Sequence, residues 1–430
     1  MRDLLVTAIV FGCLPFALIQ PWFGVLVWSW LGYMNPHRLT WGFAQEMPFA
    51  QMIGGAILVG LLFTKERRPI PWRVESVTLA LLWAVFTMTS FSALNPAEAW
   101  IQWEKVTKIF LMTFVTMILF QDRRKLRLLL LVIALSIGFF GFKGGIFAIL
   151  TGGREQVLGP PESFIGGNTE IALALIMVLP VLLFLAREEE RRWLRFGLRL
   201  TFVLSVIAVL ATYSRGGLIG LLLVLLLLLR KSRVKVLALC ALLLGGVIAY
   251  NFLPEQWFGR MSTITEYEQE PSAVGRLMAW KVAVGMALDR PFTGGGFEFW
   301  SREVFQRYLP GYRGVHDAHS IYFEILGEHG FVALALFLGV IFSTLWSLAR
   351  VRRVARRDPE LAWAVNYSEM ITTSLLGYLV SGAFLGLAYF DLFYHLVAIA
   401  LILRTLVARK DPWPVSGTLS PVSVGWLERR

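Results

Sequence analysis

The pattern of hydrophobic and polar positions divides the chain into long apolar runs joined by shorter polar connections. Most runs have the length of a membrane-crossing helix, and they lack the alternation over roughly ten residues that marks outer-membrane barrel strands. The first run contains Pro15 and Pro21, so it can form one kinked crossing or two half-length helices. Counted as one crossing, it gives an all-α polytopic membrane protein with about 12 transmembrane helices. The runs cover residues 4–33, 48–63, 75–94, 105–120, 128–142, 168–186, 200–213, 217–229, 235–253, 330–349, 369–388 and 392–408.

Composition agrees with a membrane location. Of the 430 residues, 57% are hydrophobic and 16% are charged, and the mean hydropathy is +0.64. The first 33 residues are apolar nearly throughout and lack a small-residue cleavage site after a short core, so we expect no cleavable signal peptide. Cys13 and Cys240 both fall in apolar runs, which predicts neither a disulfide nor a metal site for them.

Positive charge is concentrated in alternate connections. The formal net charge is +12, and six basic clusters hold 27 of the 41 Lys and Arg residues. Because basic connections stay in the cytoplasm, the alternation predicts that these clusters and both chain termini are cytoplasmic and contact anionic lipid. Nucleic acid is not an expected partner, since the sequence offers no soluble basic domain to bind it. The clusters are residues 65–73, 123–127, 187–199, 230–235, 350–357 and the tail from 404.

The opposite, outer face receives one large segment with helix punctuation. Ser272 is a candidate N-cap, and Asp289 is followed by Arg-Pro, a stop signal. The helix between them is short and apolar enough to lie in the membrane interface, where Arg276 and Trp280, four residues apart, share a face. The chain is thus expected to have four parts: transmembrane helices in 1–253, the outer segment with interfacial helices in 254–329, transmembrane helices in 330–408 and a cytoplasmic tail in 409–430.

Three features of the outer face suggest binding of an anion. Arg215 lies in SRGG between two apolar runs with almost no loop, and its guanidinium offers a rigid fork of donors to a phosphate or carboxylate; the alternative is an interfacial anchor. Lys143 ends a run in GFKGG and could widen a cationic pocket, although a snorkelling lysine is the more ordinary interpretation. Gly294–Gly296 allow close backbone approach, but no P-loop lysine follows them.

Residues 314–330, GVHDAHSIYFEILGEHG, place three of the five histidines and three carboxylates at the outer mouth of a helix. Ionisable groups at such a depth are costly and are usually functional. A neutral imidazole of His316 or His319 could act as a general base, and His319 shares a helix face with Tyr322. A metal ligand and an interfacial polar residue remain open as alternatives, although an H-x-x-H pair alone is a weak metal pattern. Of the other histidines, His329 beside Gly330 is expected to be a helix-entry residue, and His37 and His395 are expected to be structural.

Four motifs in order resemble the O-antigen ligase/polymerase superfamily of bacterial inner-membrane glycosyltransferases of the GT-C type. They are SRGG at 214–217, GRLMAW at 275–280, PFTGGG at 291–296 and HSIYFEILGEHG at 319–330. The resemblance covers about residues 168–403. Separately, residues 21–44, PWFGVLVWSWLGYMNPHRLTWGFA, resemble the front end of exosortase-associated O-glycosylation ligases.

The resemblance implies transfer of a glycan from undecaprenyl diphosphate to a lipid A–core sugar at the periplasmic face. It assigns the ligase histidine to His319 and the two arginines that bind the diphosphate to Arg215 and Arg276. The family's His-Asn-like pair has Ser320 in second place here, which departs from that pattern. Trp280, Tyr322, His316 and Lys143 are secondary candidates for lining the substrate site. The implied chemistry is an inverting, metal-independent displacement that needs no cofactor.

Two other functions are compatible with the sequence. A polymerase that joins repeat units, or a ligase that glycosylates protein, would keep the chemistry and change the acceptor. A flippase or transporter for a lipid-linked glycan would need no chemistry, but it would be expected to carry charged residues near mid-membrane and an inverted repeat. No internal symmetry is visible, and the ionisable residues gather at one face.

Overall fold

A computed structural model describes residues 1–161, 163–230, 254–262 and 271–410. Cys240, the apolar run 235–253 and the tail after residue 410 lie outside these residues. The described part is helical and contains no strand. Its α-helices are α1 (Arg2–Ile19), α2 (Pro21–Met34), α3 (Phe49–Phe63), α4 (Val74–Phe91), α5 (Pro96–Leu119), α6 (Arg123–Leu150), α7 (Asn168–Glu188), α8 (Arg192–Ala211), α9 (Arg215–Arg230), α11 (Glu255–Ser262), α12 (Pro271–Asp289), α13 (Arg302–Tyr308), α14 (Ile321–Ala355), α15 (Ala362–Gly382) and α16 (Asp391–Lys410).

The chain is a polytopic all-α membrane protein. Within the described residues seven helices are long and apolar enough to cross a membrane, namely α1, α4, α6, α7, α8, α14 and α16. The shorter apolar helix α3 has 15 residues. The count of 12 crossings therefore stays a prediction. Local sequence explains several helix starts: Pro96 occupies the first turn of α5, and the Asp122 side chain caps α6 by accepting a hydrogen bond from the Lys125 backbone N–H at 2.8 Å.

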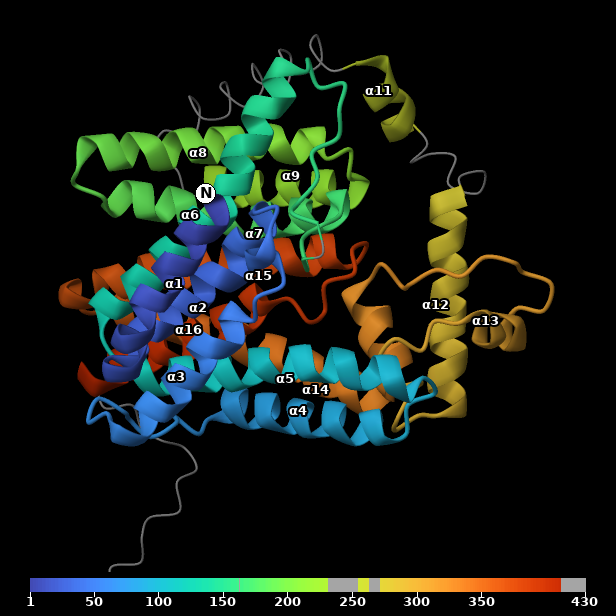
Figure 1. The fold of residues 1–430 in the computed structure, drawn as a ribbon, viewed down its shortest axis with the longest axis horizontal. Helices are drawn as coiled ribbons and strands as arrows, with labels where there is room; N and C mark the ends of the chain where they lie inside the picture. The colour runs from blue at the N-terminus through green and yellow to red at the C-terminus, as the bar shows by residue number, and fades with distance from the viewer. Residues whose placement is uncertain (162, 231–253, 263–270, 411–430) are drawn as a thin grey trace, which may run out of the picture.

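The helices form a bundle with α7 near its centre. α7 contacts α6, α8, α9 and α15, and 83% of the residues in its most apolar stretch are buried. Small residues let neighbouring helices approach closely: a Cβ at Gly220 of α9 would lie 1.7 Å from the Ser381 hydroxyl oxygen on α15. Figure 1 shows α4, α5 and α14 running along the long axis of the molecule, with α12 across their direction at one side.

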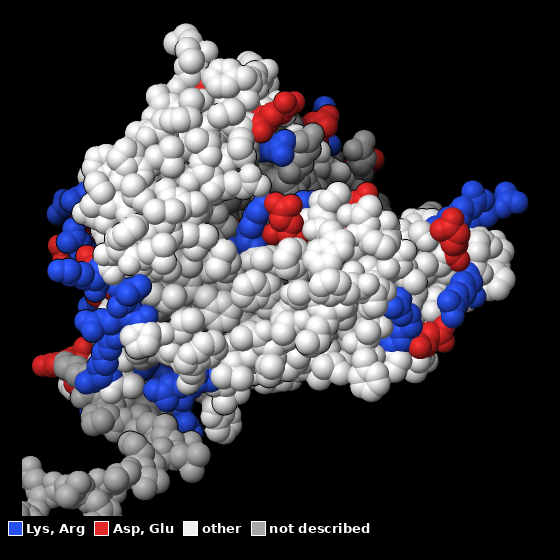
Figure 2. Space-filling model, turned by 60° about the horizontal axis from the view of Figure 1, so that its bottom comes forward, with Lys and Arg blue, Asp and Glu red and all other residues white. Residues whose placement is uncertain are grey.

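The two ends of the bundle differ in charge. Ion pairs join several of the basic connections to one another: Lys125 Nζ lies 2.6 Å from Glu66 Oε2, and Arg404 Nη1 lies 2.9 Å from Glu75 Oε1. We call this the basic end and the opposite one the outer end. On the face seen in Figure 2, Lys and Arg side chains gather at the left of the molecule, other residues cover most of the middle, and further charged residues lie near the centre, at the top and at the right.

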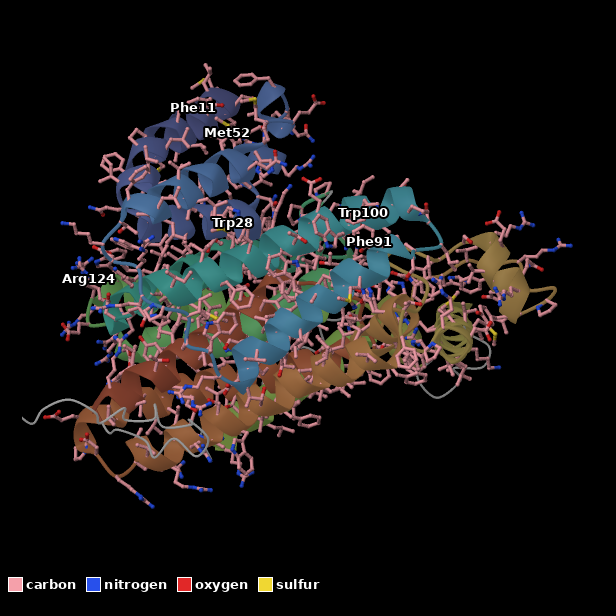
Figure 3. All side chains as sticks on the ribbon, turned by 90° about the horizontal axis from the view of Figure 1, so that it is seen from below. Phe11, Trp28, Met52, Phe91, Trp100 and Arg124 are labelled. Carbon is pink, nitrogen blue, oxygen red and sulfur yellow. The ribbon has the colours of Figure 1, made fainter. Side chains whose placement is uncertain are left out.

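Aromatic side chains mark the outer end. In Figure 3, Arg124 lies at one end of the molecule, and Phe91 and Trp100 lie together towards the other. The rings of Phe91 and Trp100 are 5.0 Å apart between centroids, and Trp100 contacts Trp103 at the same distance. Such aromatic rings are typical of a membrane–water interface.

The N-terminus corrects one expectation. Residues 4–33 form two antiparallel helices, because the chain turns at Gln20 and Pro21 begins α2. The Asp3 carboxylate accepts a hydrogen bond from the Ala44 backbone N–H at 3.2 Å, and the Arg2 guanidinium lies 4.8 Å from the Trp41 ring centroid. The start of the chain therefore lies at the outer end, beside residues 41–44. The two helices return the chain to the end at which it starts, so the count of one net crossing for this run was wrong, and the cytoplasmic location of both termini stays a prediction.

The outer segment and its flanks differ in detail from the predicted boundaries. α12 begins at Pro271, so Ser272 lies inside the helix and is not its N-cap; its end at Asp289 is as predicted. α6 continues to Leu150, past Lys143, so Lys143 does not end the helix. α14 bends at Gly330, whose backbone has φ 77° and ψ −172°.

Candidate active site

His319 lies immediately before α14, on strained backbone. Its φ is 41°, in the left-handed region that side chains with a Cβ rarely adopt. Ser320 is the N-cap residue of α14, and the helix begins at Ile321. His319 therefore precedes the helix, whereas the sequence suggested that it lies on a helix face with Tyr322. Such strain persists only where the surrounding structure enforces it, and it gathers at functional sites.

The His319 ring is paired with a carboxylate. Its Nε2 atom lies 2.8 Å from Asp317 Oδ1. Its Nδ1 atom is buried and has no hydrogen-bond partner among the described residues. When Nε2 carries the proton and donates it to Asp317, Nδ1 presents a lone pair, which is the tautomer that a general base requires.

α12 lies against this histidine segment. The Trp280 indole N–H donates a hydrogen bond to the Ala318 carbonyl at 2.8 Å, and the Trp280 ring stacks on Phe323 at 4.6 Å between centroids. One turn earlier, a Cβ at Gly275 would lie 3.0 Å from the His316 ring. Arg276 follows Gly275 on the half-exposed part of the same helix. These contacts place the part of α12 that contains Arg276 against residues 316–318.

Arg215 occupies the first position of α9. The Ser214 side chain caps this helix by accepting a hydrogen bond from the Gly217 backbone N–H at 3.0 Å. The Arg215 side chain is half-buried, at the helix end where the peptide dipoles place partial positive charge. Helix N-termini ordinarily favour acidic neighbours, so a guanidinium there adds to a field that attracts an anion.

The connection between α15 and α16 packs against Gly216, the neighbour of Arg215, and against His319. A Cβ at Gly216 would lie 3.1 Å from Phe384 Cβ. Two residues on, a Cβ at Gly386 would lie 3.6 Å from His319 Cα and 3.6 Å from Glu324 Oε2. The residues that follow Arg215 and those that surround His319 thus pack on the same short connection, so tertiary packing brings the two motifs together.

A buried polar network supports the start of α14. Glu328 accepts a hydrogen bond from the Glu298 backbone N–H at 3.1 Å and another from the Tyr389 hydroxyl. His329 Nε2 lies 3.0 Å from the Tyr389 hydroxyl, and its Nδ1 lies 2.6 Å from Thr89 Oγ1. Both ring nitrogens of His329 thus have partners within the protein. The network ties α14 to α4 and to two loops.

The glycine run packs against the same helix. The backbone N–H groups of Gly295 and Gly296 donate to the carbonyls of Gly327 and Glu328 at 2.9 and 2.8 Å. Gly294 and Gly296 have φ of 56° and 82°, and a Cβ at Gly294 would lie 2.5 Å from the Glu328 carbonyl carbon. The run allows close backbone approach, as predicted, and the N–H groups of Gly295 and Gly296 are hydrogen-bonded to α14.

Two of the secondary candidates have different surroundings. The Tyr322 hydroxyl donates to the Leu379 carbonyl at 3.0 Å, so this side chain joins α14 to α15. Lys143 is exposed on α6, and no contact described here connects it to His319. His316 packs between Gly275 and Tyr312, with 6.1 Å between the centroids of the His316 and Tyr312 rings.

Asp317 and Glu328 have contacts that the sequence did not predict. The Asp-x-His spacing of Asp317 and His319 was the only sign in the sequence that these two residues could pair. The Asp317 carboxylate contacts the ring because His319 adopts a left-handed backbone. Partial burial raises the pKa of the nearby Glu298 carboxyl; Lys105 opposes this rise and Asp317 adds to it. Within the described residues, no group of three or more His, Cys, Asp or Glu is arranged to hold a metal ion.

Comparison with known protein families places the site in a family. Residues 200–338 match the family model described as O-antigen ligase. These residues form an O-antigen ligase domain. The domain contains Arg215, Arg276 and His319, so all three principal candidates lie in the matched segment.

The remainder of the chain is less informative. Residues 1–190 match a family of unknown function (DUF5935), so the N-terminal resemblance to exosortase-associated ligases stays a prediction. No curated protein matches the chain. The match of residues 200–338 to the O-antigen ligase model agrees with the resemblance to the ligase/polymerase superfamily found from the motifs.

Proposed function

We propose that this protein is an O-antigen ligase that transfers a polysaccharide from undecaprenyl diphosphate to a sugar hydroxyl of lipid A–core. The reaction would take place at the periplasmic face of the bacterial inner membrane. The observation that carries the proposal is the Asp317–His319 pair, on strained backbone, packed against the connection that also contacts the start of α9 at Arg215. The O-antigen ligase domain that contains these residues gives independent support.

His319 is the general base in this mechanism. Its Nδ1 atom takes the proton of the acceptor hydroxyl, while Asp317 holds the ring through Nε2 and stabilises the imidazolium that forms. The acceptor oxygen attacks the anomeric carbon of the donor, and the bond from that carbon to the diphosphate oxygen breaks with inversion. No enzyme carboxylate needs to form a glycosyl intermediate, in contrast to a retaining glycosidase.

Arg215 and Arg276 stabilise the leaving group. The electron pair of the broken bond leaves on undecaprenyl diphosphate, where the added negative charge needs neutralisation. Two guanidinium groups can bind a diphosphate through paired hydrogen bonds. The N-terminal dipole of α9 acts in the same direction as Arg215. Trp280, on the face of α12 that carries Arg276, would shield the site from water and guide the polyprenyl chain.

The decisive experiment reconstitutes the purified protein in liposomes with an undecaprenyl-diphosphate-linked glycan and lipid A–core. We expect joined product together with released undecaprenyl diphosphate, both dependent on acceptor. The same donor is then offered a second lipid-linked repeat unit or a protein acceptor in place of lipid A–core. Preference for either would replace the ligase assignment by polymerase or protein glycosylation.

A transport assay separates the non-enzymatic alternative. If the donor crosses the membrane of the liposomes and no acceptor releases undecaprenyl diphosphate, the protein is a transporter of lipid-linked glycan and the proposal fails. Chelation of divalent cations should leave transfer unchanged, because the proposed step is routed through His319 and the two arginines. Loss of activity on chelation, restored by added metal, would contradict this mechanism.

A further inference from the structure

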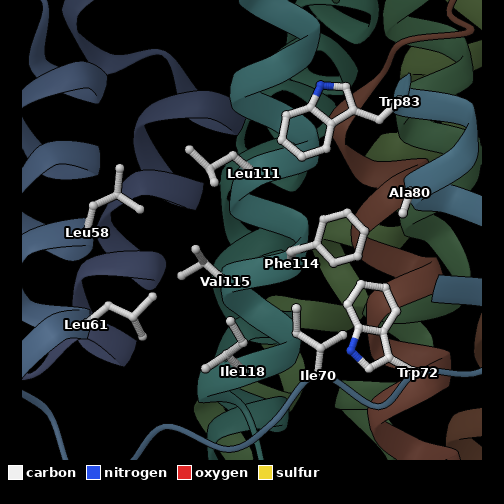
Figure 4. Close-up of a pocket in the computed structure, with 10 residues that line it drawn as sticks. All are labelled: Leu58, Leu61, Ile70, Trp72, Ala80, Trp83, Leu111, Phe114, Val115 and Ile118. Atoms are coloured by element: carbon white, nitrogen blue, oxygen red, sulfur yellow. The ribbon is translucent and has the colours of Figure 1, made fainter. Parts of the chain in front are cut away.

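A pocket lies at the basic end of the bundle, away from His319. An apolar pocket of about 300 Å³ opens between α3, α4, α5 and the connection from α3 to α4. Every side chain that lines it is hydrophobic, and Figure 4 shows them arranged around an open space. The volume is at the lower limit of small-molecule sites.

One wall of the pocket is a rigid aromatic stack. Phe114 lies between two indoles, 6.3 Å from Trp83 and 6.4 Å from Trp72 between ring centroids. The Trp83 N–H donates to Thr107 Oγ1 at 3.1 Å, so its polar atom is turned to a partner and its ring faces the pocket. The opposite wall is formed by Leu58 and Leu61 of α3. The shape is therefore built by packed side chains and does not depend on a ligand.

The mouth of this pocket is cationic. The connection that closes it contains Ile70 and Trp72, which line the pocket, and also Arg67 and Arg68. The Arg68 backbone N–H donates to the carbonyl of the lining residue Ile118 at 3.1 Å, which fixes the backbone of this arginine beside the pocket. Both guanidinium groups are exposed, and no described side chain pairs with either of them.

We propose that this pocket binds an anionic phospholipid of the leaflet at the basic end, with one acyl chain in the pocket and its phosphate headgroup on Arg67 and Arg68. An acyl chain gains little by leaving other lipid for an apolar protein surface, so the chain alone cannot select its ligand. Selection must come from the headgroup, and basic residues next to apolar surfaces at the cytoplasmic side favour anionic lipid. The neighbouring Glu66 is neutralised by Lys125, so the rim keeps its positive charge.

The proposal can be tested by photolabelling. The full-length protein is placed in nanodiscs of phosphatidylethanolamine that carry a small fraction of a phosphatidylglycerol with a diazirine on its acyl chain. We expect labelling of peptides from α3, the 64–73 connection and α5. The same diazirine on phosphatidylethanolamine should label these peptides much less. Equal labelling by the two lipids, or labelling confined to other helices, would overturn the proposal.

Two variants and one control identify the parts of the site. The double variant Arg67→Ala/Arg68→Ala should lower labelling by phosphatidylglycerol by up to roughly 30-fold, equivalent to about 1 kcal/mol for each arginine. Ala80→Phe places a ring in the pocket and should lower labelling of these peptides by both lipids. Arg192→Ala/Arg199→Ala removes the same charge from α8, away from the pocket, and should change nothing. An equal loss in this control would show that only net charge matters and would refute a built site.

Discussion

The two ends of the bundle use arginine and backbone geometry in different ways. At the basic end the helices begin and end regularly, and arginines such as Arg127 are matched by carboxylates of neighbouring helices. At the outer end the backbone is strained: the described non-glycine residues with positive φ are Asn35, Tyr213, Glu298 and His319, all of which lie on outer connections. Strain is costly and is kept where a side chain must take one orientation. The positive-φ residues of the outer end agree with the proposal that the chemistry takes place there and not at the basic end.

The largest effect is expected for the proposed base. His319→Ala removes the proton acceptor and should lower transfer by roughly 10²- to 10⁴-fold, the usual contribution of general base catalysis. The measurement is formation of joined product from lipid-linked glycan and lipid A–core. His316→Ala serves as the matched control and should lose far less, since its ring packs on Gly275 and does not pair with Asp317. An equal loss in both variants, with both proteins folded, would remove His319 from its role.

Next in size are the two arginines that bind the diphosphate. Arg215→Lys and Arg276→Lys keep the charge and lose the planar fork of donors, so each should lower the rate by on the order of 10²-fold. The measurement varies the donor concentration at saturating acceptor, and the rate of transfer should be lower than that of the unsubstituted protein. Full activity in either lysine variant would show that only charge is required there.

A smaller effect is expected for the residue that positions the base. Asp317→Asn keeps the size of the side chain but offers less negative charge to the imidazolium, and Asp317 is 57% exposed. We expect a roughly tenfold to hundredfold loss, less than for a buried orienting carboxylate, because water screens the pair. The loss should fall on kcat and leave the KM for donor nearly unchanged. If instead KM for donor rises and kcat is constant, Asp317 binds substrate and does not position His319.

The smallest effect is expected at the basic end. Arg127→Ala breaks an ion pair with Glu189 of 2.8 Å, in which Arg127 is 41% exposed. Such pairs contribute about 0–1 kcal/mol, so Tm in detergent should fall only slightly and transfer should be unchanged. A loss of transfer comparable to that of Arg215→Lys would contradict the functional separation of the two ends.

Much of the fold could be predicted because hydrophobic periodicity and charge report directly on a membrane. The apolar runs located most of the described helices, and the basic clusters marked one end of the bundle. The error at residues 4–33 has a physical cause: Pro21 is compatible with a kink and with the first position of a new helix, and only the contacts of Arg2 and Asp3 with residues 41–44 distinguish the two.

The candidate site was predictable in its motifs and not in its geometry. His319, Arg215 and Arg276 were recognisable because their residue types and order resemble a family, and the O-antigen ligase domain covers all three. The pairing of His319 with Asp317 could not be read from spacing, because it depends on a backbone φ of 41°. The apolar pocket at the basic end could not be predicted from the sequence either, since its aromatic wall comes from residues on two helices and a connection.

The sequence by itself determined that this chain is a helical membrane protein, which face carries the ionisable motifs and which superfamily they resemble. These properties follow from side-chain type and order, which do not depend on how helices pack. Tertiary structure alone decided that the N-terminus lies at the outer end, that the connection between α15 and α16 packs against both Gly216 and His319, and that Glu328 anchors α14. Such contacts join residues far apart in the chain, so they arise only when the helices pack and buried polar groups find their partners.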